Sequence, residues 1–274
     1  MPVEAPYPSL DELMRLIGEA GRHLAEIQAS EGAAGNISVY IGWELDPGDH
    51  FTSVEDFELP EAVPQLANGS FLATGSGRRL REVGIDPLAN LGLVKVGKDG
   101  KTAKLYTSPR RLFARLTSEF NSHVAVHGDQ IARTGSNFHA LIHAQPLHLT
   151  YLSHISRYQD ESYLNQHILR WQPEGIVQIP DGVGYIPFKI PGSHDLMEAN
   201  VASLREHRIV LWAKHGVMSR SEASVKRACD LVEYSETGAR YEYMNLTNHG
   251  LADGLSREEI LAVCKTIGIE QKVF

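Results

Sequence analysis

Apolar residues along this chain follow two different spacings, and each spacing predicts a kind of element. Between residues 9 and 29 they recur at near-helical intervals, at Leu13, Leu16, Ile17, Leu24 and Ile27, which predicts an amphipathic helix. Elsewhere they form short continuous runs, which favour strands. The strand-like runs are the end of the small-residue stretch 31–40, and 71–73, 91–96, 104–106, 140–142, 176–179, 185–188 and 209–213.

Further helical patterns and turn signals complete this picture. Helices are predicted at 118–133, 146–155, 195–207, 221–244 and 256–267, the last opened by a capping box from Ser256 to Glu259. The turn at 97–100 joins two strands into a β-hairpin, whereas the acidic, proline-bearing stretch 44–66 is expected to cross the surface. Because hairpins and helix crossovers both occur, we predict one α/β domain over residues 1–274 with strands in mixed directions.

Composition narrows the class of protein. The 274 residues are 42% hydrophobic and carry a formal charge of -8, which argues against a broad nucleic-acid surface. No apolar run approaches the ~18 residues of a membrane span, and no signal-peptide pattern opens the chain. Cys229 and Cys264 lie in helix-like sequence and are expected to be buried structural thiols in a reducing compartment. A cytoplasmic enzyme that binds neither membrane nor nucleic acid fits best.

Two histidines stand out because each follows a short apolar run. His143 ends Ala140–Ile142, His215 follows 209–213, and Glu119 comes directly after the hydroxyl pair Thr117-Ser118. Two imidazoles and a carboxylate that converge could form a catalytic metal site with an open position. The alternative for either histidine alone is a hydrogen-bonded core side chain.

Two small-residue loops are candidates for binding an anion. Gly35 permits close backbone approach and Asn36 offers an amide donor, although a helix C-cap and turn is the alternative. The second loop is 74–77 (TGSG), followed by Arg78 and Arg79. Its glycines can expose backbone N–H groups to a phosphate, and the hydroxyls and arginines add further donors. The alternative is a tight turn.

The helix that follows the hydroxyl pair carries two more candidate residues. Ser118 can cap this helix, which places Glu119 in its first turn and His123 one turn further along the same face. A carboxylate is favoured at a helix N-terminus for structural reasons alone. We expect His123 to be a partly buried side chain that orients a neighbour or packs, rather than a metal ligand.

Taken in order, these motifs resemble the class II aldolase/adducin family over nearly the whole chain. The matching segments are 34–38 (AGNIS), 71–77 (FLATGSG), 86–92 (DPLANLG), 117–119 (TSE) with His123, 140–143 (ALIH), 180–184 (PDGVG) and 211–217 (LWAKHGV). Each segment is weakly specific, and the resemblance depends on all seven occurring in this order.

The resemblance implies a fold, an assembly and a reaction. The fold is a central, mainly antiparallel sheet flanked by helices, in a homotetramer with sites between subunits. The reaction is reversible cleavage of L-rhamnulose 1-phosphate, or a related ketose 1-phosphate, to dihydroxyacetone phosphate and L-lactaldehyde through a metal-stabilised enediolate. The metal is divalent, normally Zn²⁺.

The resemblance also implies roles for particular residues. Glu119 is the acid/base, and His143 and His215 are metal ligands. The substrate phosphate is held by Gly35, Asn36, Gly75, Ser76, Thr117 and Ser118. A neighbouring subunit contributes an acidic residue, for which Glu174 is a weak candidate.

One departure from the family pattern bears on the metal. The family shows His-x-His where this chain has His143-Ala144-Gln145, and a Gln carbonyl holds zinc less tightly than imidazole does. Gln145 can still be a ligand, His148 or His139 can replace it, another ion can be preferred, or the metal can be lost. Two functions therefore stand beside the aldolase: a sugar-phosphate 4-epimerase with the same enediolate chemistry, and a non-catalytic adducin-like scaffold.

Overall fold

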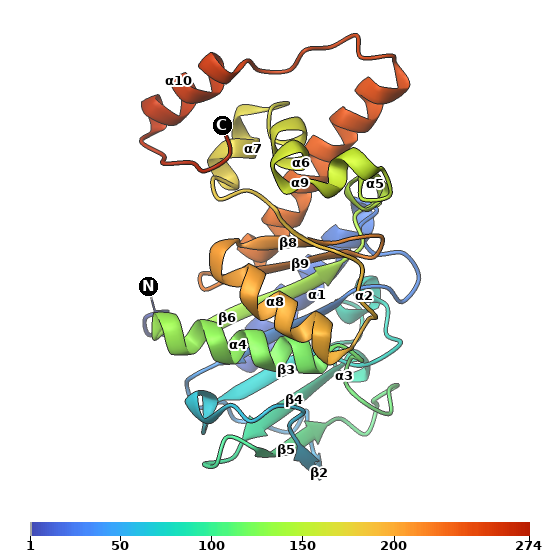
Figure 1. Ribbon diagram of the computed structural model, residues 1–274. Coiled ribbons are helices and arrows are strands. Elements are labelled where there is room, and N and C mark those ends of the chain that lie inside the picture. Colours follow the sequence, from blue (N-terminus) through green and yellow to red (C-terminus); the bar gives the residue numbers. More distant parts are fainter. Residues whose placement is uncertain (1) are drawn as a thin grey trace.

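The computed structural model describes residues 2–274, and its centre is one sheet with helices on both faces (Figure 1). The strands described are β1 (Asn36–Ile41), β2 (Ser53–Glu58), β3 (Ser70–Thr74), β4 (Leu91–Val96), β5 (Thr102–Thr107), β6 (Phe138–Ala144), β7 (Gly184–Ile186), β8 (Ile209–Trp212) and β9 (Gly216–Ser221). They pair in the order β2-β5-β4-β3-β1-β6-β9-β8-β7. Every pair is antiparallel except β7 and β8, which confirms the expected mainly antiparallel α/β fold.

Helices cover both faces of the sheet and extend beyond one edge. They are α1 (Leu10–Glu26), α2 (Leu80–Val83), α3 (Pro87–Asn90), α4 (Phe120–Thr134), α5 (Leu147–Leu152), α6 (Glu161–Ile168), α7 (Pro173–Gln178), α8 (His194–Glu206), α9 (Val225–Thr247) and α10 (Arg257–Ile267), with 3₁₀ turns η1 (Pro64–Leu66) and η2 (Ser156–Gln159). In Figure 1, α4 and α8 lie together across one face and α1 lies behind the sheet, while α5, α6, α7 and α10 gather beyond β8.

Strand β6 shows why the central strands read as continuous apolar runs. Leu141 packs with Val126 of α4 and Leu196 of α8 on one face. The next residue, Ile142, points to the other face and shares a core with Ile17 of α1. Because both faces are covered, neither can be polar, and the alternation typical of a half-buried strand is lost.

The sheet ends at a charged edge strand. All but one of the six positions of β2 are exposed, and they include Glu55, Asp56 and Glu58. Charged side chains along an edge discourage pairing with another chain. The stretch 44–66, expected to be irregular, thus contains one strand and one 3₁₀ turn that the sequence analysis missed.

Most of the other predicted elements are confirmed. The first helix begins with a capping box between Ser9 and Glu12, and α10 begins with the predicted box between Ser256 and Glu259. The predicted hairpin is β4–β5, and the runs before His143 and His215 are β6 and β8. Both cysteines are buried and free, as expected.

The prediction of a strand at 176–179 is wrong, because these residues belong to the helix α7 and its C-cap. Pro173 occupies the start of this helix, where its missing N–H costs nothing. Four apolar residues in a row do not distinguish a short buried helix from a strand. The sequence analysis also missed α2, α3, α6 and β9, whose patterns are short or mixed.

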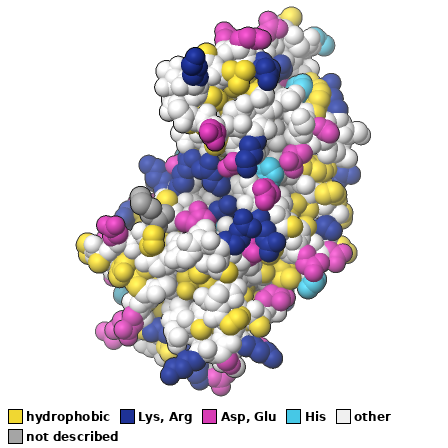
Figure 2. Space-filling model, turned by 60° about the vertical axis from the view of Figure 1, so that its left-hand side comes forward, with side chains coloured by type: hydrophobic (Ala, Val, Ile, Leu, Met, Phe, Trp, Pro, Cys, Tyr) yellow, Lys and Arg dark blue, Asp and Glu magenta, His cyan; other side chains and the backbone are white. Residues whose placement is uncertain are grey.

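Charges of both signs are mixed on the surface. On the face shown in Figure 2, basic side chains gather near the middle with acidic ones among them. Ion pairs such as Arg205–Asp129, at 2.7 Å, link the two kinds. Among the described residues, no helix is long and apolar enough to cross a membrane.

Candidate active site with a metal-binding cluster

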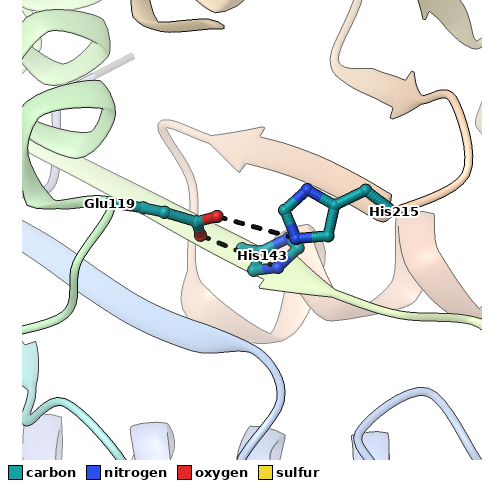
Figure 3. A group of neighbouring side chains, drawn as sticks. All are labelled: Glu119, His143 and His215. Carbon is teal, nitrogen blue, oxygen red and sulfur yellow. Dashed lines mark ion pairs between the residues drawn. The ribbon is translucent and has the colours of Figure 1, made fainter. Parts of the chain in front are cut away.

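Chain segments that are far apart in sequence meet at one end of the central strands. In the register of β1 and β6, Asn36 lies opposite His143. The turn between β8 and β9 carries His215, and Trp212 lies opposite Gly216 across this turn. Glu119 immediately precedes α4. Figure 3 shows Glu119 directed toward the two imidazoles, of which His143 comes from β6 and His215 from the turn between β8 and β9.

The structure brings Glu119, His143 and His215 together. Glu119 Oε2 lies 3.6 Å from His143 Nε2, and Glu119 Oε1 lies 3.7 Å from His215 Nε2. One ligand atom from each residue lies within 4.8 Å of the others. Glu119 and His143 are buried, and His215 is half-buried. These separations are too long for direct hydrogen bonds, and a divalent ion could be shared by the three groups.

Hydrogen bonding fixes which nitrogen of His143 faces the cluster. Its Nδ1 lies 2.8 Å from the carbonyl oxygen of Val217. A carbonyl can only accept, so Nδ1 carries the proton and Nε2 keeps its lone pair. Metal-binding histidines are commonly oriented by such a bond on the far nitrogen. The ring also stacks on Trp212, with centroids 4.5 Å apart.

A tight turn holds His215 in place. Lys214 has φ +62°, a left-handed conformation that is unusual for a residue with a side chain. A Cβ on Gly216 would lie 2.3 Å from the carbonyl oxygen of Ala144, so only glycine fits there. Burial, together with the nearby His143, lowers the pKa of His215 to about 4 against the opposing effect of Glu119. The ring is therefore neutral at pH 7, the form that binds metals.

Glu119 receives a hydrogen bond from the edge of β1. The amide Nδ2 of Asn36 donates to Glu119 Oε2 at 2.9 Å. Burial by itself would raise the pKa of Glu119, but the neighbouring histidines and this amide outweigh it and hold the pKa below its ordinary value. The prediction that Ser118 caps α4 is wrong, because Glu119 occupies the N-cap position and no side chain caps the helix.

The predicted phosphate-binding residues all line one cavity beside the cluster. This cavity has a volume of about 190 Å³. Its lining includes Gly35, Asn36, Gly75, Ser76, Thr117 and Ser118, together with Glu119, His143, Gln145 and His215. The sequence analysis therefore assembled the correct set of neighbours, although it could not give their arrangement.

The glycine loop differs from the expected nest of free backbone donors. The N–H of Gly75 bonds to Asn90 and that of Ser76 to Arg115, both at 2.9 Å. A Cβ at Gly75 would lie 2.2 Å from the ring of Phe113, so this glycine is required by packing. Since these N–H groups are occupied, the hydroxyls and the amide of Asn36 at the cavity wall are the donors for an anion. Arg78 also lines the cavity, and its guanidinium bonds to Asn90 and Glu82.

Of the three candidates for a further metal ligand, only Gln145 lines the cavity. His139 bonds through Nδ1 to Nδ1 of His127 at 2.7 Å, and His148 bonds to Glu236 at 2.6 Å. Gln145 also lines a second, larger cavity of about 730 Å³. Glu174 is exposed on α7 and does not line the site cavity of its own chain.

His123 is fully buried and bonds to both Asn36 and Ser38. The expectation of an orienting histidine thus agrees with its position, but it is not partly exposed. The sequence analysis missed the partners Ser38 and His127. The spacing of His123 and His127, four residues apart on one helix face, was the available signal.

Comparisons with known proteins show the family of this chain. Residues 15–243 match the family described as the class II aldolase and adducin N-terminal domain. The chain is 31% identical over 211 residues to a rhamnulose-1-phosphate aldolase of Escherichia coli O7:K1, covering 77% of this chain and 76% of the relative. A rhamnulose-1-phosphate aldolase of Enterobacter sp. strain 638 is 30% identical over the same length, with 77% and 75% covered.

Solved structures show the same fold. A sugar-phosphate aldolase from Thermotoga maritima superposes with a TM-score of 0.72 at 28% identity, covering 87% of this chain and 97% of that one. An L-fuculose-1-phosphate aldolase from Thermus thermophilus, at 22% identity and a TM-score of 0.56, covers 89% and 98% and shows the fold alone. This chain therefore belongs to the class II aldolase and adducin N-terminal domain family, as one of its aldolase-type carbon–carbon lyases.

Proposed function

We propose that this protein is a divalent-metal-dependent aldolase that reversibly cleaves L-rhamnulose 1-phosphate, or a related ketose 1-phosphate, to dihydroxyacetone phosphate and L-lactaldehyde. The observation that carries the proposal is a carboxylate and two imidazoles on the wall of a cavity whose lining also includes hydroxyls, glycines and the amide of Asn36. A phosphorylated ketose needs hydrogen-bond donors for its phosphate, and a metal and a carboxylate for the carbons that are cleaved.

In this proposal the hydroxyls of Ser76, Thr117 and Ser118 hold the phosphate. Phosphate held at one end of the cavity orients the carbons to be separated. The binding energy of the phosphate thereby holds the reacting atoms in the geometry required for cleavage. Asn36 has one amide N–H on Glu119 and a second N–H left for the substrate. Gly35, with φ +84°, would place a Cβ 2.9 Å from the carbonyl oxygen of His143 and so keeps the wall close.

His143 and His215 are the proposed ligands of the ion, with Gln145 as a weaker third ligand. The two imidazole nitrogens and the neighbouring carboxylate suit Zn²⁺, which we propose as the metal. When bound, a divalent ion supplies Lewis-acid stabilisation of the negative charge left by carbon–carbon cleavage.

Glu119 is the proposed proton carrier. Cleavage removes a proton from the hydroxyl that becomes the aldehyde and adds one to the carbon left behind. Asn36 occupies Oε2 of Glu119, whereas Oε1 faces His215 and the cavity. A carboxylate so placed can take up one proton and return it within the same turnover.

We further propose a cytoplasmic homotetramer. The exposed apolar side chains of Leu147 and Tyr151 border the larger cavity that shares Gln145 with the site, and a second copy could cover them. Phosphorylated sugars do not cross membranes unaided, which favours the interior of the cell. Light scattering of the purified protein tests the subunit count.

The decisive experiment is an assay of dihydroxyacetone phosphate formation from L-rhamnulose 1-phosphate. The protein is tested metal-replete, chelator-stripped and stripped with Zn²⁺ restored, with Glu119→Gln as the inactive control. We expect activity to be lost on stripping and to return with the ion. Interconversion of epimers without dihydroxyacetone phosphate would indicate an epimerase instead, and absence of both turnover and metal binding would indicate a scaffold.

A further inference from the structure

A line of buried side chains runs from Glu119 into the interior between α4 and the sheet. Asn36 Oδ1 is bonded to Nε2 of His123. Nδ1 of His123 lies 2.6 Å from Ser38 Oγ, which lies 2.7 Å from Nε2 of His127. His127 is bonded in turn to His139. Ser38 and the three histidines are fully buried, so no exchange with bulk water competes with these bonds.

The carboxylate at one end determines the direction of every bond in this line. Glu119 accepts from the amide N–H of Asn36, so Asn36 presents its oxygen to His123. That oxygen accepts, hence Nε2 of His123 carries the proton and Nδ1 is a lone pair. Ser38 must then donate to His123, leaving its oxygen to accept from Nε2 of His127.

The same reasoning continues to the last histidine. His127 has its proton on Nε2, so its Nδ1 accepts from Nδ1–H of His139. Nε2 of His139 is left as a lone pair, and it is the one ring nitrogen in this line that has no partner among the described residues. Burial lowers the pKa of His123 to about 4 and that of His139 to about 3, and holds that of His127 well below its ordinary value. All three rings are therefore neutral at pH 7.

We propose that Ser38, His123, His127 and His139 are positioning residues that lock the side-chain amide of Asn36 with its N–H toward Glu119. An amide can rotate by half a turn at little steric cost, which would place its oxygen against the carboxylate. The rotated amide would present N–H to N–H on His123 unless every proton in the line moved with it, and that shift would leave a buried N–H on Nε2 of His139, which has no acceptor among the described residues. This inference rests on the proposed role of Glu119 as proton carrier.

The line positions a group and does not conduct protons. Each member already donates toward Glu119, but Asn36 stands between His123 and the carboxylate. Passing a proton through an amide requires a high-energy imidic acid form, so delivery of protons along the line is blocked at this residue. Loss of the line should therefore affect mainly how well Glu119 is prepared for catalysis, because the hydroxyls of Ser76, Thr117 and Ser118 that are proposed to hold the phosphate stay in place.

The first test compares two serines. Ser38→Ala removes the hydroxyl that both donates to His123 and accepts from His127, and Ser219→Ala removes a hydroxyl that is equally buried in β9 but bonds to Ala228. Losing one hydrogen bond to a charged group corresponds to roughly a ten- to hundredfold change. We expect kcat to fall by that factor in Ser38→Ala, with a smaller change in KM, and both constants to stay near wild type in Ser219→Ala.

A rescue series tests His123 itself. Gln at this position can present a donor where Nε2 stood, whereas Asn is too short to reach Asn36. We expect His123→Gln to retain more of kcat than His123→Asn at matched thermal stability. Equal losses in the two variants, or losses that follow stability alone, would overturn the positioning role.

A third test does not depend on turnover or on correct folding of any variant. In wild-type protein labelled with ¹⁵N-histidine, we expect His123 and His127 to be neutral with the proton on Nε2, and His139 to be neutral with the proton on Nδ1. A proton on Nδ1 of His123, or a doubly protonated ring at pH 7, would overturn the inference. If the predicted tautomers are found but no sugar phosphate is cleaved, the proposed function fails and the orientation of Asn36 stands.

Discussion

Two groups of histidines beside the central strands β1 and β6 are built in opposite ways. In the site cluster, His143 and His215 keep Nε2 at 3.6–3.7 Å from Glu119, too far for hydrogen bonds. In the buried line, His127 approaches Ser38 and His139 at 2.7 Å. The first arrangement leaves lone pairs available to a ligand, whereas the second uses them internally. The spacing of nitrogen atoms, more than the number of histidines, distinguishes a metal centre from a structural network.

The largest expected effect is loss of the metal from the cluster. His143→Ala removes one of the two proposed imidazole ligands, and losing Lewis-acid stabilisation worth several kcal/mol should lower kcat by at least about a thousandfold. Metal content measured by mass spectrometry should fall with it. His139 lies four residues before His143 on the same face of β6, and we expect the His139→Ala variant to retain its metal. Loss of metal in both variants would contradict the distinction between the two groups.

The next largest effect concerns the turn that holds His215. Gly216→Ala adds a Cβ that would lie 2.3 Å from the carbonyl oxygen of Ala144. Relieving this clash costs about 1–3 kcal/mol of stability and displaces the imidazole. We expect a lower melting temperature together with weaker metal binding. Gly250→Ala, where a Cβ meets nothing within 4 Å, controls for the loss of glycine as such, though its φ of +74° adds some strain.

Acid should lower the stability of the folded protein through the histidines of the buried line. The pKa of His139 is about 3 in the folded protein, below the ordinary 6.5. Between these values the unfolded chain binds more protons, so stability is lost as pH falls below 6.5, by up to about 1.4 kcal/mol per pH unit for each such histidine. Urea unfolding at pH 7 and pH 5 should show a smaller loss of unfolding free energy for His139→Gln than for wild type. His249→Gln, at an exposed position, should lose as much unfolding free energy between the two pH values as wild type does.

The smallest effect is expected at Gln145. Gln145→His restores the His-x-His triplet of the family and replaces a neutral oxygen donor by imidazole. We expect tighter Zn²⁺ binding, by roughly tenfold if the new ring reaches the ion. Competition with a chromogenic chelator measures this affinity. Unchanged affinity would show that residue 145 does not contact the ion, and Gln145→Asn provides a shorter oxygen donor for comparison.

Sequence reasoning predicted a set of residues that the structure brings together, but not their arrangement. His143 ends one apolar run and His215 follows another. Both runs are strands of one sheet whose C-terminal ends lie on the same side, so the two imidazoles meet there. The occupied N–H groups of Gly75 and Ser76 were not predictable, since they depend on Asn90 and Arg115 in neighbouring segments. The link from Ser38 to His127, 89 positions apart, likewise depends on tertiary packing. Local patterns predict elements, and contacts between distant elements require the fold.

The stacking of Trp212 on His143 gives the site an optical property. The chain has three tryptophans, and Trp212 is the one whose ring lies against both His143 and His215, with centroids 4.5 Å and 5.0 Å away. Its Nε1 is fixed by Asn200 at 2.6 Å, so the indole cannot turn away. Any ion that binds these imidazoles alters the electric field at the indole and hence its fluorescence. The protein therefore contains an intrinsic reporter through which occupancy of the centre can be followed without a label.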